Sequence, residues 1–70
     1  MVTTMQMTAI LNADPDGGYV ALNPETGTTT QGDSVEEAVA NLREAVELYL
    51  DEFPLKTTGA PIVTSFDVAA

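Results

Sequence analysis

The longest regular pattern of apolar residues runs from Gly32 to Pro54 and predicts one amphipathic helix. Apolar side chains recur there at steps of three and four residues, which gathers them on one stripe of a helix. They are Val35, Ala38, Val39, Leu42, Ala45, Val46, Tyr49, Leu50 and Phe53. Ser34 and Glu37 have the spacing of a capping box, and Pro54 predicts an end near Asp51 to Phe53, because proline cannot continue the hydrogen-bond ladder. The stripe needs a covering layer, so its members are expected in a core.

Three segments before this helix and one after it have the pattern of β-strands. Residues 2–12 alternate between two faces, residues 19–23 are almost continuously apolar, and residues 28–31 are polar but β-prone. After the helix, residues 62–68 alternate again. One face of this last segment consists of Ile62, Thr64, Phe66 and Val68. The sequence therefore predicts four strands and one helix in the order β-β-β-α-β.

This order predicts an α+β fold of residues 1–70 as a single domain, with the helix packed on a mainly antiparallel four-stranded sheet. Turn residues at 14–18 and 24–27 make the first three strands antiparallel neighbours. A right-handed crossover would then set the last strand parallel to the first. Asp14 and Asp16 also suggest a calcium loop, but an EF-hand would need glycine where Tyr19 stands. We interpret this segment as a plain turn.

The charge of the chain favours basic partners. Eleven acidic residues against Arg43 and Lys56 give a net charge of −9, which repels phosphate backbones. We therefore expect no direct nucleic-acid binding by this chain alone. Without cysteine, a signal peptide or an apolar run of about 18 residues, we expect a cytoplasmic protein that has no membrane segment. Because 70 residues bury only a small core, we expect a homo-oligomer, either a dimer or a tetramer.

A series of motifs between Gly18 and Leu50 is similar to one known family. They are Gly-Tyr-Val-Ala-Leu at 18–22, Asn-Pro-Glu at 23–25, Thr-Gln-Gly-Asp-Ser at 30–34 and a helix that starts with Glu-Glu-Ala at 36–38. Together they resemble HicB-family antitoxins of type II toxin-antitoxin systems. The resemblance implies a truncated ribonuclease-H-like domain that binds and neutralises a small basic HicA-type toxin, which cleaves mRNA.

The sequence departs from this family in two respects. Many members carry a helix-turn-helix or ribbon-helix-helix segment after the domain, whereas this sequence ends at Ala70 and resembles a short form without the DNA-binding segment. Repression by this chain alone is therefore not expected. The turn at 24–27 is also shorter than in many members of the family, and Thr28 and Thr29 stand where apolar residues are common. We therefore expect the contacts made by the strand at 28–31 to differ from those in the family.

Two other function classes compete with the antitoxin interpretation. A ribonuclease-H-like enzyme needs several carboxylates around two metal ions, and the strands lack acids at suitable positions. Without histidine or cysteine, no nucleophile and base pair is available either, so we predict no enzyme and no catalytic, cofactor-binding or metal-binding residues. The second alternative is a stand-alone oligomeric protein-interaction module with no toxin partner. An adjacent gene for a small basic protein would distinguish it from an antitoxin.

The predicted partner-binding residues lie on the polar side of the helix. They are Glu36, Glu37, Glu44, Glu47, Leu48 and Asp51. We expect the acidic side chains of this set to mimic the phosphates that a basic, RNA-binding toxin normally contacts. Leu48 falls away from the apolar stripe, so we expect it to be exposed as part of an interface.

Overall fold

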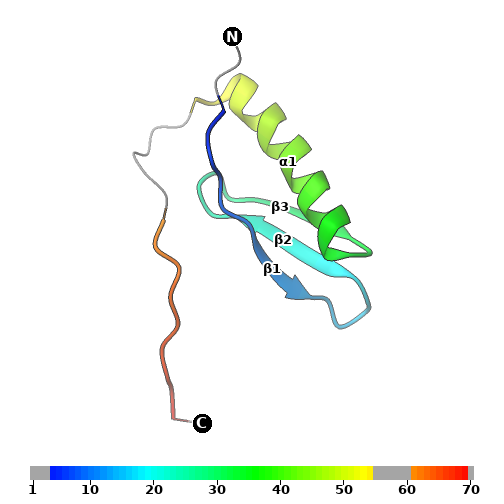
Figure 1. Cartoon of the computed structure of the whole chain (residues 1–70), viewed down its shortest axis with the longest axis vertical. Helices are drawn as coiled ribbons and strands as arrows, with labels where there is room; N and C mark the ends of the chain where they lie inside the picture. The colour runs from blue at the N-terminus through cyan, green and yellow to red at the C-terminus, as the bar shows by residue number, and fades with distance from the viewer. Residues whose placement is uncertain (1–3, 55–60, 70) are drawn as a thin grey trace.

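The structure is a computed structural model that describes residues 4–54 and 61–69. Its elements are β1 (Ile10–Ala13), β2 (Tyr19–Asn23), β3 (Thr28–Gly32) and α1 (Val35–Glu52). Figure 1 shows α1 crossing one face of a small sheet, while the last described residues run apart from that sheet. The predicted α+β class is confirmed. Within the described residues, no helix combines the length and apolar character that crossing a membrane requires.

The sheet is antiparallel, with β2 in the centre between β1 and β3. Ala21 in β2 pairs with Leu11 in β1 and with Thr30 in β3, and all three side chains lie on the face towards α1. Ile10 and Leu22 pair on the opposite face, because side chains alternate along a strand. Both are half-buried, so the uncovered face of the sheet keeps some apolar surface.

Two glycines allow close backbone contacts at the junction of β2, β3 and α1. A side-chain carbon added at Gly18 would lie 2.6 Å from the Gly32 carbonyl oxygen, and one added at Gly32 would collide with the backbone of Ala38. Gly18 also has a φ of 78°, which favours glycine. Gly18 therefore brings the start of β2 close to the end of β3, and Gly32 brings the end of β3 directly against the first turn of α1.

The predicted ends of α1 are confirmed. The Ser34 side chain accepts a hydrogen bond from the Glu37 backbone N–H at 3.1 Å. The Glu37 carboxylate accepts from the Asp33 N–H at 3.2 Å, whereas in a capping box this second bond comes from the N-cap residue itself. The second half of the cap is therefore displaced by one residue. At the other end, α1 stops at Glu52, two residues before Pro54.

The core is small. Among the described residues, the buried apolar side chains are Ala21, Ala38, Leu42 and Val46. Met7, Leu11, Tyr19 and Leu50 pack around them while partly exposed. Such a core contributes little stability by itself, because the hydrophobic effect scales with the apolar area that is buried.

The prediction that Tyr49 and Phe53 lie in the core is wrong. Their side chains are 37% and 54% exposed, and their rings contact each other with centroids 5.0 Å apart. The reason is a mismatch of lengths: eighteen helical residues extend about 27 Å, whereas a five-residue strand extends about 17 Å. The last turns of α1 therefore project beyond the sheet, as Figure 1 shows.

Two strand predictions need correction. The first strand begins at Ile10, so residues 4–9 pass β2 without regular pairing, and residues 2 and 3 lie outside the described part. The predicted fourth strand at 62–68 does not form: residues 61–69 have no sheet partner, and the sheet described has three strands. An alternating pattern becomes a strand only when its backbone pairs with a sheet edge, and residues 61–69 stay exposed and unpaired in the described part of the chain.

Candidate partner-binding surfaces

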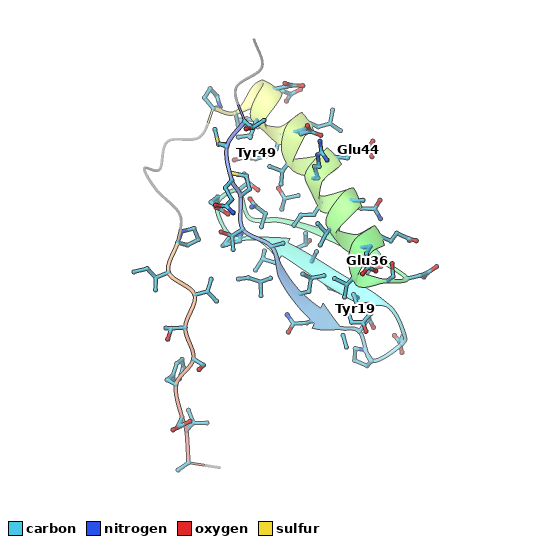
Figure 2. The ribbon with its side chains drawn as sticks, viewed as in Figure 1. Tyr19, Glu36, Glu44 and Tyr49 are labelled. Carbon is cyan, nitrogen blue, oxygen red and sulfur yellow. The ribbon has the colours of Figure 1, made fainter. Side chains whose placement is uncertain are left out.

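The structure places five predicted acidic residues on one exposed side of α1. They are Glu36, Glu37, Glu44, Glu47 and Asp51. At 100° per residue they fall within a sector of about 100°, opposite the buried Ala38 and Leu42. Figure 2 shows Glu44 on the side of α1 that faces away from the sheet. With a rise of 1.5 Å per residue, this acidic face extends about 22 Å along the helix.

One of these acids also has a structural role. The Glu37 carboxylate accepts the Asp33 backbone N–H, and the Glu37 N–H is held by Ser34. Glu37 therefore stabilises the start of α1 in addition to its place on the acidic face. The other four carboxylates are exposed on the helix surface, so they are better positions at which to test binding.

Leu48 lies beside the acidic face and is 64% exposed, so the prediction that it is exposed is confirmed. Tyr49 and Phe53 form a second exposed apolar group at the same end of α1. This end of the helix therefore places exposed apolar and aromatic side chains beside a polar surface, and protein interfaces have such an apolar centre with a polar rim.

A groove lies between the segment before β1 and α1, with a volume of about 590 Å³. Met5 and Met7 line one wall, and Val39, Val46 and Leu50 line the other. Arg43 and Glu47 also border it. The groove exists because α1 lies over β2 and β3 rather than over β1. Sequence reasoning missed it, since the position of a helix over a sheet is not a local property.

The predicted turn between β1 and β2 is confirmed. The Asp14 side chain accepts the Asp16 backbone N–H at 2.9 Å, and Gly17 and Gly18 have positive φ angles of 105° and 78°. Asp14 borders a small polar hollow together with Asp33. In the part of the chain that the structure describes, no three acidic, histidine or cysteine side chains are grouped to hold a metal ion.

A buried polar network, which sequence reasoning also missed, holds the segment before β1 in place. The fully buried Asn23 side chain donates to the Thr8 carbonyl and to Glu25, both at 2.8 Å. Its oxygen accepts from the Thr26 N–H at 2.9 Å and from the Thr26 hydroxyl at 2.7 Å. Glu25 in turn accepts the Thr8 hydroxyl at 3.0 Å. All four hydrogen-bonding positions of the Asn23 amide are therefore used.

Comparison with known proteins identifies the family. A UPF0150 protein of Synechocystis sp. is 44% identical over 48 residues, which are 67% of each chain. A UPF0150 protein of Thermoplasma acidophilum is 40% identical over 48 residues, which cover 67% of this chain and 70% of that relative. The chain belongs to the UPF0150 family.

A further UPF0150 relative extends well beyond the matched region. This second Synechocystis protein is 47% identical over 45 residues, which are 63% of this chain and only 57% of the relative. The names of these UPF0150 proteins state no activity, substrate or partner. No family model matches the chain, and no solved structure gives a significant match.

Proposed function

We propose that this UPF0150 protein is an antitoxin that binds and neutralises a small basic toxin of the HicA type. The observation that carries the proposal is the acidic face of α1, whose carboxylates are exposed and held in a row by one regular helix. The net charge of −9 favours a basic partner. The similarity of residues 18–50 to HicB-family antitoxins, in a chain with the α+β class which that similarity implies, supports a toxin as this partner.

The acidic face acts mainly on the rate of association. A toxin that binds RNA presents basic side chains where phosphates normally lie, and a row of carboxylates offers it a substitute. Opposite charges attract over about 8 Å at physiological salt, and such steering raises association rates by about 10-fold to 1,000-fold. We therefore expect association to slow as salt is added.

Leu48 acts on the lifetime of the complex. Buried apolar contacts mainly determine how slowly a complex dissociates, whereas charges at the rim change how fast it forms. Leu48 is exposed beside the acidic face, where contact with a partner would remove it from water. Leu48→Ala should therefore raise the dissociation rate and leave the association rate nearly unchanged.

The test is co-expression and co-purification with the small basic protein encoded beside this chain, together with a growth-rescue assay. The probe is the double reversal Glu44→Lys/Glu47→Lys, and the matched control is Asp16→Lys/Asp67→Lys, which changes the net charge equally but away from α1. We expect the probe to slow association at least about tenfold more than the control, because steering depends on local charge.

The outcomes separate the function from its mechanism. If no such neighbour exists, or if it is harmless when expressed alone, the antitoxin proposal fails. If rescue and association are the same for the probe and the control, the acidic face is not the binding surface, although the antitoxin function stands.

The alternative function is a stand-alone oligomeric interaction module with no toxin partner. The exposed apolar side chains at 62–68 favour self-association and require no toxin. Self-association in the absence of any toxic neighbour would support this alternative.

A further inference from the structure

The last described segment is apolar and uncovered. Ile62, Phe66 and Val68 are 93%, 85% and 74% exposed, and all three lie on one face of the alternating pattern. Figure 1 shows residues 61–69 as an extended stretch that runs apart from the sheet of its own chain. Exposing several large apolar side chains to water is unfavourable, so we expect residues 61–69 to pack against another surface.

The same molecule offers a surface of matching chemistry. The groove beside β1 is apolar on both walls, formed by Met5 and Met7 on one side and Val39, Val46 and Leu50 on the other. It adjoins β1, which pairs only with β2 in the described sheet and so leaves its other edge free to accept a strand.

The opposite edge of the sheet is partly occupied by α1. The Asn41 side chain donates to the Gln31 carbonyl of β3 at 2.8 Å, and the Thr30 hydroxyl donates to the Ala38 carbonyl at 3.0 Å. These bonds join β3 to the helix, whereas α1 is displaced from β1. The β1 edge is therefore the better place for an added strand.

We infer that two copies of this chain exchange residues 61–69, each adding this segment as a strand to the β1 edge of the other and filling its groove. The inference concerns self-association and does not depend on the proposed toxin. Reciprocal exchange forms a closed dimer with twofold symmetry, in which both edges and both segments are covered.

The surface area supports a second copy as the occupant. The chain exposes 5813 Å², whereas a compact monomer of 7.4 kDa should expose about 4,200 Å². The excess is roughly 1,600 Å², about twice what each partner buries in an interface of standard size. The radius of gyration, 13.8 Å, likewise exceeds the roughly 11 Å expected for 70 residues.

Charge also favours this segment as the contact between copies. Two chains with a net charge of −9 repel each other, yet residues 61–69 contain a single acid, Asp67. The groove that receives the segment is bordered by one cationic side chain, Arg43, and one acidic side chain, Glu47, so its border carries no net charge. The proposed contact therefore joins the least acidic parts of two acidic molecules.

The first test is the molar mass of the full chain, measured by sedimentation or light scattering at about 10 to 100 μM. We expect twice 7.4 kDa for the wild type. Phe66→Asp should raise the dissociation constant of the dimer at least about a hundredfold, because it puts a charge into both grooves. Val63→Asp is the matched control on the other face of the segment, and it should keep the dimer.

A monomeric wild type would overturn the inference, as would a Phe66→Asp variant that dimerises normally or a Val63→Asp variant that is equally impaired. Phe66→Leu should retain the dimer, which separates the loss of apolar contact from any general effect of changing this position.

The second test separates exchange between copies from folding back within one chain. The chain has no cysteine, so Thr64→Cys can be combined in turn with Met5→Cys or Ala9→Cys and oxidised. We expect a covalent dimer on a non-reducing gel for at least one pair. A disulfide within the monomer, or no disulfide for either pair, would overturn the inference.

Discussion

Replacing Asn23 with alanine should destabilise the fold by about 3 to 4 kcal/mol. The Asn23 side chain is fully buried and makes four hydrogen bonds of 2.7 to 2.9 Å, each of which contributes about 1 kcal/mol. Its removal also leaves the Thr8 carbonyl and the Thr26 N–H without these partners. The loss is large for 70 residues, whose total stability is roughly 4 to 10 kcal/mol.

The assay is urea unfolding followed by the helical circular dichroism signal, with Asn12→Ala as the matched control. Asn12 is an exposed residue of β1, and the same substitution there should change stability by less than about 0.5 kcal/mol. If Asn23→Ala costs less than about 1 kcal/mol, or no more than Asn12→Ala, the network does not hold the segment before β1.

The change Asn23→Asp keeps the size of the side chain but replaces the donor that now contacts Glu25. Burial and the nearby carboxylate should raise the pKa of the new carboxyl group above its unfolded value of about 3.9. Below about pH 4 the new carboxyl group is protonated in both the folded and the unfolded state, so its ionisation lowers the stability of the variant little. As the pH rises from there, the unfolded state loses its proton first, and the variant should lose about 1.4 kcal/mol of stability per pH unit until the raised pKa is passed.

Two further predictions concern the junction between the sheet and α1. Gly32→Ala should lower the free energy of unfolding, measured with urea, by about 2 to 3 kcal/mol, because the added methyl group collides with the helix backbone. The matched control is Gly27→Ala, where the added methyl group would have no atom within 4 Å. This control should lose only about 1 kcal/mol, because alanine is strained at a φ of 78°. Equal costs would contradict the close packing. Ser34→Ala should cost about 1 kcal/mol through loss of the helix cap, and Ser34→Asp should restore most of it; an unchanged urea midpoint for Ser34→Ala would count against this cap.

The elements that the sequence predicts correctly are those with local signals. Ser34 and Pro54 mark the ends of α1 because capping and the loss of a backbone donor act within a few residues. The turn after β1 follows from Asp14 and two glycines for the same reason. Sequence reasoning also identified the row of acids on α1, because a helix fixes the angle between successive residues.

The features that sequence reasoning missed depend on how elements meet. Tyr49 follows the apolar stripe of α1, yet it is 37% exposed because the helix is longer than the strands below it. Asn23 looks like an ordinary turn residue, although its neighbours in space include Thr8 from a distant part of the chain. Residues 62–68 alternate as a strand would, but a strand forms only by pairing, and this segment pairs with no strand of the described sheet.

Most of the acidic face lies on a different side of α1 from the groove, but Glu47 belongs to both. At 100° per residue, Glu44 lies about 120° from Leu50, whereas Glu47 lies about 60° from it and borders the groove. A dimer formed through the groove therefore leaves most of the acidic face free on each copy, and a complex of two chains with two toxins is geometrically allowed. It follows that Phe66→Asp should change the molar mass without abolishing the salt-dependent association with a basic partner. Reversal of Glu44, which does not border the groove, should have the converse effect, slowing that association while the dimer persists.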